Sequence, residues 1–584
     1  MAPVAPTAPT AQAPPSAAPT AEQHASPACT DPVPVFVGGK TAGRVCPEEA
    51  QEQGLTIVDL SDDWVPYLLR GDEHGSDGPA EPHPYRATYV TLANEQFGHG
   101  PEWERARHDV FLELYGISPS FKVLAARLLD QERFECHRKV DSSPIAALQQ
   151  PSIDVYKPLH AAAARAAAAA LDARLVCERL LPANAKKRPR WRLQAALEAY
   201  QRKHTVVTRG LLDRETRQVL AEDPRELDWR ATLRALRARL VDATGVIEDG
   251  SARGERGRVF GRRLDGEAFY QAAYDALEEG APDYVSVATE AAARALGWLD
   301  VDSTTAFFRE RGADGTRRLR VALQLPPRPD YHGPHMELRA EIDRGDVWYD
   351  QPQQRGRVER RPTLTLWAKT PEGREIAVVR WPTTIGGWKK EAAGSWGRVV
   401  LRYKNSDVGP RMWRDLIALP AWLPPPKTPP RTIVRRGDGN QWLPDTDLVG
   451  PGYASAYGMV MLVHHEPVQR KGQLTWDDHG IRTHGSVSYD SIQRGESHGC
   501  HRLFNQSAIQ LASFLLQHRK SVRHGLDTRP FVHTFAWRGH TMKLPIPNRG
   551  YRFELTPPIA VEVLEGRIRG RLKRVPTKAL YVHK

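Results

Sequence analysis

The spacing of apolar residues changes near residue 336, and this change constrains the fold more than any other feature. Before it, apolar side chains recur every three or four positions, as in residues 229–240, which predicts helices with one buried face. After it, apolar and polar residues alternate, as in residues 336–342, which predicts strands. We therefore predict a multidomain α+β chain with a mostly helical N-terminal half and a C-terminal mixed β-barrel or sandwich.

A chain of 584 residues is too long for one hydrophobic core, so we expect several domains. We predict an Ala/Pro-rich linker (1–34), an N-terminal module of unassigned role (35–154), a helical domain (155–224), a helical spacer (225–330), a β-rich domain (331–545) and a C-terminal β extension (546–584). Within these domains, helices are expected at 110–112, 121–129, 267–277 and 286–296, and Ser286 is expected to cap the last of them. The turn residues 371–373 before the apolar run 376–379 predict a β-hairpin, and a further helix is expected after Cys500, with Asn505 or Ser507 as its cap.

The chain is basic, with a formal net charge of +12 and an isoelectric point near 9.4, which favours an anionic partner. The sequence contains no Lys/Arg cluster, no zinc-ligand spacing and no aromatic RNA-binding motif, so we predict no nucleic-acid partner. It also contains no run of 18 apolar residues, so we predict no transmembrane segment. An anionic polymer other than nucleic acid fits the same charge.

The sequence holds five cysteines, which leave an odd thiol after pairing. Their order suggests the pairs Cys29–Cys46 and Cys136–Cys177, with Cys500 free, although sequence alone does not determine connectivity. Disulfides indicate an oxidising compartment outside the cytoplasm, and five reduced, buried cysteines are the alternative. The first residues lack the basic and apolar parts of a signal peptide, and we interpret the linker as what remains after an export signal is removed.

The stretch 481–503 carries the residue types of a nucleophilic site. It contains His484-Gly485-Ser486, then a loop, then Ser497-His498-Gly499-Cys500. A thiol attacks a carbonyl as the thiolate, so it needs an imidazole or a cation nearby. The glycine before the cysteine permits a tight turn in which backbone amides can hold a developing oxyanion.

This stretch resembles the signature of the YkuD-type L,D-transpeptidases, which runs His-Gly-(Ser/Thr), a loop, then Ser-x-Gly-Cys-x-Arg-(Leu/Met). The matching residues are His484, Gly485, Ser486, Ser491, Ile492, Ser497, His498, Gly499, Cys500, Arg502, Leu503 and Asn505. Two positions depart from the family: His501 replaces an aliphatic residue, and Gln493 replaces a common glycine. His501 leaves open which imidazole acts as the base.

The resemblance implies roles for individual residues. Cys500 would be the nucleophile and His484 the base, and the amides of Gly499 and Cys500, with His498, would form the oxyanion hole. Ser486 and Ser497 would orient the imidazole and the turn. Arg502 would bind the substrate carboxylate or fix the loop. The residues of a substrate-facing rim would be Tyr453, Tyr457, His501 and Arg502.

The resemblance implies no cofactor and no metal. His464, His465 and Glu466 are residue types that bind metals, but adjacent residues of a strand point to opposite faces of the sheet, which argues against a shared ion.

A second resemblance lies within residues 155–224, where helical spacing surrounds a glycine and an Asp cap. The pattern resembles the second half of a small three-helix peptidoglycan-binding domain, and a plain helical hairpin is the alternative. The matching residues are Ala196, Tyr200, Gln201, Arg202, His204, Gly210, Asp213, Thr216 and Leu220.

Together the two resemblances imply a periplasmic or cell-envelope enzyme that forms 3–3 cross-links between peptidoglycan stem peptides through a cysteine thioester. Its partners would be the stem peptides and the glycan. Three alternatives remain: an L,D-carboxypeptidase, a transferase that anchors an envelope protein to the wall, and a non-catalytic wall-binding protein. A papain-like peptidase is disfavoured because its cysteine precedes its histidine in the chain.

Overall fold

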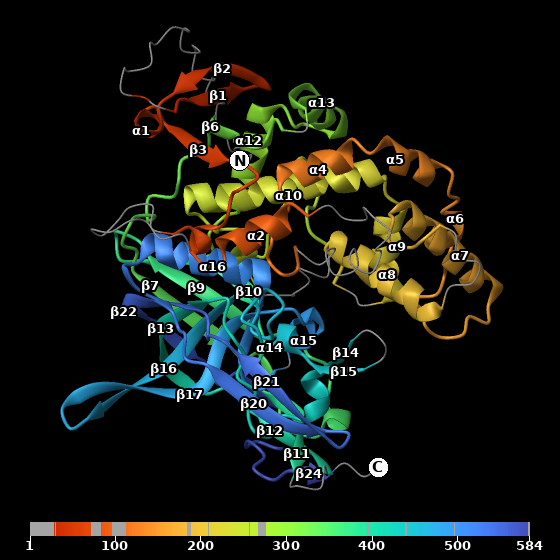
Figure 1. Cartoon of the computed structure of the whole chain (residues 1–584). Helices are drawn as coiled ribbons and strands as arrows, with labels where there is room; N and C mark the ends of the chain where they lie inside the picture. Colours follow the sequence, from red (N-terminus) through yellow and green to blue (C-terminus); the bar gives the residue numbers. More distant parts are fainter. Residues whose placement is uncertain are drawn as a thin grey trace, which may run out of the picture.

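The computed structural model describes residues 29, 31–71, 83–95, 113–183, 189–207, 210–255, 257–266, 276–312, 314–393, 398–437, 441–495 and 497–581. The predicted linker therefore lies almost wholly outside the described residues, as do the helix expected at 110–112 and most of the one expected at 267–277. The chain combines helices with several β-sheets and is an α+β protein, with most of its helices before residue 312 and most of its strands after it (Figure 1).

A large mixed sheet forms the C-terminal half. Its strands run in the order β10-β9-β7-β22-β13-β16-β17-β18, and β19 pairs with β22. The bounds are β7 Leu338–Asp343, β9 Thr363–Lys369, β10 Glu375–Pro382, β13 Gly409–Ala418, β16 Val460–Arg470, β17 Gln473–Ser486, β18 His501–Phe504, β19 Ser521–Leu526 and β22 Tyr551–Val563. The hairpin expected around residues 371–373 is confirmed as β9–β10, and the predicted extension at 546–584 supplies the central strand β22.

The two end strands of this sheet, β10 and β18, approach each other without forming a ladder. Side chains that follow β10 bridge the gap: Thr383 Oγ1 donates to the Arg502 carbonyl at 3.0 Å, and Thr384 Oγ1 accepts from the Arg502 amide at 2.9 Å. The sheet is therefore nearly closed into a barrel. The seam lies at the strand that follows Cys500.

Helix α16 (Asn505–His518) covers one end of the sheet (Figure 1). Its apolar residues, such as Ile509, Leu515 and Phe514, are buried in one core with the strands. We expected Asn505 or Ser507 to cap this helix. That expectation is wrong: the helix begins at Asn505, and the N-cap residue is Phe504, whose side chain gives no cap hydrogen bond.

A second core joins segments that are distant in the sequence. A four-stranded sheet has the order β2-β1-β6-β3, in which β6 (Arg320–Gln324) lies between β1 (Val33–Val37) and β3 (Leu55–Asp59), and β2 is Lys40–Val45. Helices α4 (Phe121–Leu128), α10 (Pro224–Thr244), α12 (Tyr284–Leu296) and α13 (Val301–Arg311) bury their apolar faces against it. Parts of the predicted module 35–154 and of the predicted spacer 225–330 thus share one core.

The helix expected at 286–296 is confirmed as α12, but its cap is not Ser286. The N-cap residue is Asp283, and its carboxylate accepts from the Ser286 amide at 2.9 Å. Asp283 precedes the first helical residue, and from there its carboxylate reaches the Ser286 amide. Ser286 lies inside the first turn and so is not at the capping position.

The residues of the peptidoglycan-binding-like pattern interlock in the small unit of α7 (Ala162–Cys177), α8 (Arg190–Lys203), β5 (Leu211–Asp213) and α9 (Arg214–Ala221). The Gln201 amide donates to the Leu211 carbonyl and to Thr216 Oγ1, both at 2.8 Å, and its oxygen accepts from the Gly210 amide at 2.9 Å. Asp213 caps α9 through the Thr216 amide, as the sequence predicts. These pattern residues hold the turn between α8 and α9.

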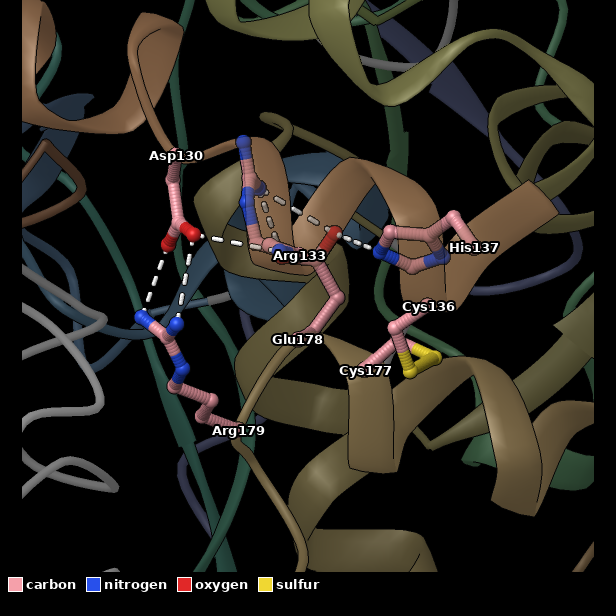
Figure 2. The surroundings of a disulfide bond; sticks show 7 residues. All are labelled: Asp130, Arg133, Cys136, His137, Cys177, Glu178 and Arg179. Atoms are coloured by element: carbon pink, nitrogen blue, oxygen red, sulfur yellow. Dashed lines mark hydrogen bonds and ion pairs between the residues drawn. A yellow bond between two sulfur atoms is a disulfide. The ribbon is translucent and has the colours of Figure 1, made fainter. Parts of the chain in front are cut away.

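A buried ion cluster fastens this unit to α5 (Gln131–Arg138) and to α10 (Figure 2). The Glu178 carboxylate accepts from Arg133 Nη1 at 3.2 Å, from Lys203 Nζ at 2.6 Å and from His137 Nε2 at 2.8 Å. Arg133 also pairs with Asp228 of α10. Burial raises the pKa of the Glu178 carboxyl, but the neighbouring cations outweigh burial and hold this pKa well below its usual range.

Both predicted disulfides are confirmed. Cys29 pairs with Cys46, Cys136 at α5 pairs with Cys177 at the end of α7, and Cys500 is a free thiol. The Cys136–Cys177 bond lies beside the ion cluster (Figure 2). Among the described residues, no helix is both long and apolar enough to cross a membrane.

Candidate active site

A tight turn, Ser497 to Cys500, presents the thiol at the start of β18. Gly499 has φ +113°, and a Cβ added there would lie 2.7 Å from the Asn405 carbonyl oxygen. Ser497 Oγ contacts the Ile385 and Cys500 carbonyls at 2.5 Å each and accepts from the Gly499 amide at 3.0 Å. The turn therefore requires a glycine, and Ser497 is placed to hold it closed.

The Cys500 thiol is partly exposed at the mouth of this turn. Its sulfur lies 3.8 Å from the Gly480 carbonyl oxygen, to which the S–H can donate. Burial raises the pKa of the thiol, whereas the Arg482 backbone amide and the charges of Arg482 and Arg502 oppose that rise. The net pKa lies above its ordinary range, so the resting thiol is protonated at neutral pH.

His484 lies on β17, the strand parallel to β18, and is opposite Arg502 in the register. Its Nδ1 is 2.5 Å from the Gly485 carbonyl oxygen, which can only accept, so Nδ1 carries the hydrogen and Nε2 keeps a free lone pair. Burial, with the charge of Arg502, lowers the pKa of His484 to about 3. At neutral pH, His484 is thus a neutral imidazole in the tautomer that a base requires.

The parallel register places His484 and Arg502 on one side of the sheet. Thr483 pairs with His501 and His484 with Arg502, and paired residues of neighbouring strands share a face. Cys500 lies in the turn one residue before β18, and the charge of Arg502 acts on both the thiol and the imidazole. The two halves of the sequence motif are thus adjacent in the fold, because β17 and the strand that follows the thiol are parallel neighbours.

Two arginines supply positive charge to this face. Arg502 Nη1 donates to Ser491 Oγ at 2.8 Å, which ties the guanidinium to α15 (Tyr489–Arg494). Arg482 makes a bidentate pair with Asp478, at 2.6 and 2.7 Å. Two roles were expected for Arg502, and the contact with Ser491 supports the one in which Arg502 fixes the loop.

The remaining histidines of the motif lie apart from His484. The His498 side chain reaches the surface, but part of it is shielded from water, and this partial burial, together with the charges of Lys389 and Arg502, lowers its pKa to about 4. His501 is fully buried at 0% exposure, on the other face of β18, where Nδ1 is 3.0 Å from the Thr384 carbonyl oxygen. His501 therefore lies on the face opposite to that of His484 and Arg502, away from the substrate-facing rim expected for it.

The other predicted site residues occupy distinct positions. Ser486 Oγ accepts from the Ser488 amide at 3.1 Å, a contact that shapes the start of α15. The Tyr457 ring stands edge-on to the His484 ring, with centroids 4.7 Å apart, and the phenol lies within electrostatic range of Cys500. Tyr453 instead stands edge-on to Tyr115 of the N-terminal half, at 5.1 Å.

The Gly499 amide already donates to Ser497 Oγ, so it is not free in this state for the predicted oxyanion hole. Using it there requires that the hydrogen bond to Ser497 break.

Residues 464–466 form no common site. His464 Nε2 accepts from the Trp413 indole at 3.0 Å and contacts Thr483 Oγ1 at 2.8 Å, whereas His465 Nε2 contacts Asp415 Oδ2 at 2.7 Å. Within the described ranges, no group of three or more His, Cys, Asp or Glu residues is arranged to hold a metal ion.

Sequence reasoning missed the residues that brace the turn from outside the motif. Thr384 Oγ1 donates to the Cys500 carbonyl at 2.8 Å, and Arg482 with Asp478 lies beside the thiol. Arg482 is two residues before His484 on β17, and this spacing, which puts both residues on one face of a strand, was a usable signal. A Thr-Thr pair after a strand carries no comparable signal.

Comparison with known proteins adds no relative. No family model matches the sequence, and no curated protein matches it either.

Proposed function

We propose that the chain is a cysteine acyltransferase of the L,D-transpeptidase type, which acts on peptidoglycan stem peptides. The observation that supports the proposal is the pairing of β17 with β18, which sets a neutral His484 of fixed tautomer opposite Arg502, two residues after the free Cys500 thiol. Positive charge from Arg482 and Arg502 surrounds the sulfur and would stabilise a thiolate.

The pKa directions favour a resting pair of thiol and neutral imidazole over a preformed ion pair. In the first step, Cys500 Sγ bonds to the carbonyl carbon at the L-centre of the third donor residue while His484 Nε2 takes the thiol proton. The imidazolium then protonates the leaving nitrogen, D-alanine departs and a thioester remains. An amine of a second stem attacks the thioester, loses its proton to His484 and forms the 3–3 cross-link, which restores the thiol.

The small helical unit with the peptidoglycan-binding-like pattern would hold the same polymer, and the basic net charge would favour the anionic wall. Two disulfides agree with a location in the periplasm or cell envelope. The proposal uses no cofactor and no metal.

Purified tetrapeptide muropeptides test the proposal, with products read by mass. Cross-linked dimers support transpeptidation, tripeptide alone supports an L,D-carboxypeptidase, and coupling to an added envelope protein supports the anchoring alternative. If the wild-type protein forms none of these products but still binds the wall, the alternative of a non-catalytic wall-binding protein is favoured. Incubation with a carbapenem should add one drug mass, and Cys500→Ala should abolish this adduct.

A matched pair of variants identifies the base. His484→Gln should lower turnover by about 10²- to 10⁴-fold, the usual contribution of a general base. His498→Gln removes an exposed imidazole two residues from the thiol and should leave turnover within about tenfold of wild type, since one neutral hydrogen bond is worth at most about 1.5 kcal/mol. Equal losses in the two variants would contradict the assignment of His484.

A further inference from the structure

Residues 113–118 of the N-terminal half lie against the elements that follow both halves of the motif. The Leu114 carbonyl accepts two hydrogen bonds at once, from Tyr489 Oη at 2.5 Å and from Asn505 Nδ2 at 3.0 Å. Tyr489 begins α15, which follows the strand of His484, and Asn505 begins α16, which follows β18, the strand after Cys500. One backbone oxygen therefore links the helix after β17 to the helix after β18.

Apolar contacts surround this link. Leu114 is buried in a small cluster with Tyr489, Ile492 and Phe504, and Val207 of the peptidoglycan-binding-like unit completes the cluster. Gly116 has φ +83°, and a Cβ there would lie 2.3 Å from Ile509 Cδ1 of α16. The segment and α16 are thus in close contact where a side chain at residue 116 would not fit.

The same segment is anchored on its other side to α10. Glu113 pairs with Arg234 at 3.1 Å, and Arg239 Nη1 donates to Ser118 Oγ at 2.9 Å. Both arginines are buried, so Arg234 depends on Glu113 for compensation of its charge and Arg239 depends on Ser118 Oγ for a hydrogen-bond acceptor. Residues 113 and 118 therefore fix the segment at both of its ends to the longest helix of the N-terminal half.

We propose that residues 113–118 form a brace that positions the active site, with Leu114 and Tyr489 as its positioning residues. The brace holds α15 and α16 at a fixed separation. Helix α15 in turn contacts Arg502, because Ser491 Oγ accepts a hydrogen bond from Arg502 Nη1. The N-terminal half thereby helps to set where the thiol and the imidazole lie relative to each other. This proposal rests on the proposed function for its consequence in turnover, but its effect on the thiol is measurable without any substrate.

The test is Tyr489→Phe, which removes the hydroxyl donor and keeps the ring. Its matched control is Tyr284→Phe, because Tyr284 Oη also donates to a backbone carbonyl, that of Pro326 at 2.8 Å, in α12 away from the motif. The first readout is the rate of Cys500 alkylation by iodoacetamide from pH 6 to 9, read by intact mass. The second is the separation of kcat from KM with muropeptides.

Loss of one such hydrogen bond should slow Cys500 alkylation in Tyr489→Phe by roughly 2- to 10-fold at pH 7. The kcat should fall by a similar factor with KM unchanged, and Tyr284→Phe should match wild type in both. An alkylation rate for Tyr489→Phe equal to that of the control would overturn the proposal.

Leu114→Ala gives a second measurement that leaves the Tyr489 hydroxyl in place. It trims the apolar cluster and should slow alkylation in the same direction, and wild-type reactivity in this variant would also count against the brace. If the wild-type protein forms no muropeptide product while both variants still slow alkylation, the proposed function fails and the brace stands. If products form and alkylation is unchanged in both variants, the brace fails and the function stands.

Discussion

Replacement of His501 by glutamine should remove a measurable part of the sensitivity of this protein to mild acid. His501 is fully buried, and burial lowers the pKa of its imidazole to about 4, against about 6.5 in an unfolded chain. As the pH falls through 6.5, the unfolded chain takes up a proton that the folded protein does not, so folded-state stability falls with pH between 6.5 and 4. Glutamine carries no titrating group and can still donate an amide hydrogen to the Thr384 carbonyl.

The magnitude follows from those two pKa values. At pH 5 the unfolded histidine is almost wholly protonated and the folded one is mostly neutral, which makes the wild type less stable by about 2 kcal/mol than at pH 7.5 through this residue alone. Urea unfolding followed by tryptophan fluorescence at both pH values measures the effect. Between pH 7.5 and 5, the free energy of unfolding should fall by about 2 kcal/mol more in wild type than in His501→Gln.

The comparison of two pH values cancels any cost of the substitution that does not depend on pH. Every other titrating group is shared by the two proteins and cancels as well. Parallel pH responses in the two proteins would refute the reasoning, because they would mean that His501 takes up its proton equally in the folded and unfolded states.

Three further outcomes are expected. Alkylation of Cys500 by iodoacetamide should be slow at neutral pH and rise by about tenfold per pH unit toward the raised thiol pKa, and a plateau between pH 5 and 8 would instead indicate a preformed ion pair. Gly499→Ala should lower kcat by roughly 10²-fold because a displaced turn misplaces the thiol, and unchanged kcat would contradict the tight contact with Asn405. Glu178→Ala should cost about 3–5 kcal/mol in the free energy of unfolding because it leaves buried Arg133 and Lys203 to share one carboxylate, that of Asp228, whereas Glu132→Ala, at a side chain that is 92% exposed, should cost under about 1 kcal/mol in the same urea titration.

Local patterns in the sequence were sufficient to predict several individual elements of the fold. Alternation and a turn predicted the β9–β10 hairpin, and helical spacing predicted α12 and α16. The order of the cysteines also predicted both disulfides. These features depend on residues close in the chain or on a small number of possible pairings.

Pairing between distant segments was not predictable in the same way. A strand pattern fixes which face of the strand is buried, but it does not name the neighbouring strand. The sequence therefore gave no reason to place β6 between β1 and β3, or to bring the Leu114 carbonyl to Tyr489. Thr384 was not predicted as a site residue for the same reason, because its partner is the Cys500 carbonyl more than a hundred residues later.

The position of β22 has a consequence for how the protein is made. This strand lies between β7 and β13, yet it follows every other strand of that sheet in chain order. A ribosome delivers it last, although it is the strand that joins β10-β9-β7 to β13-β16-β17-β18. The two groups of strands can therefore be united in one sheet only after synthesis has passed residue 563.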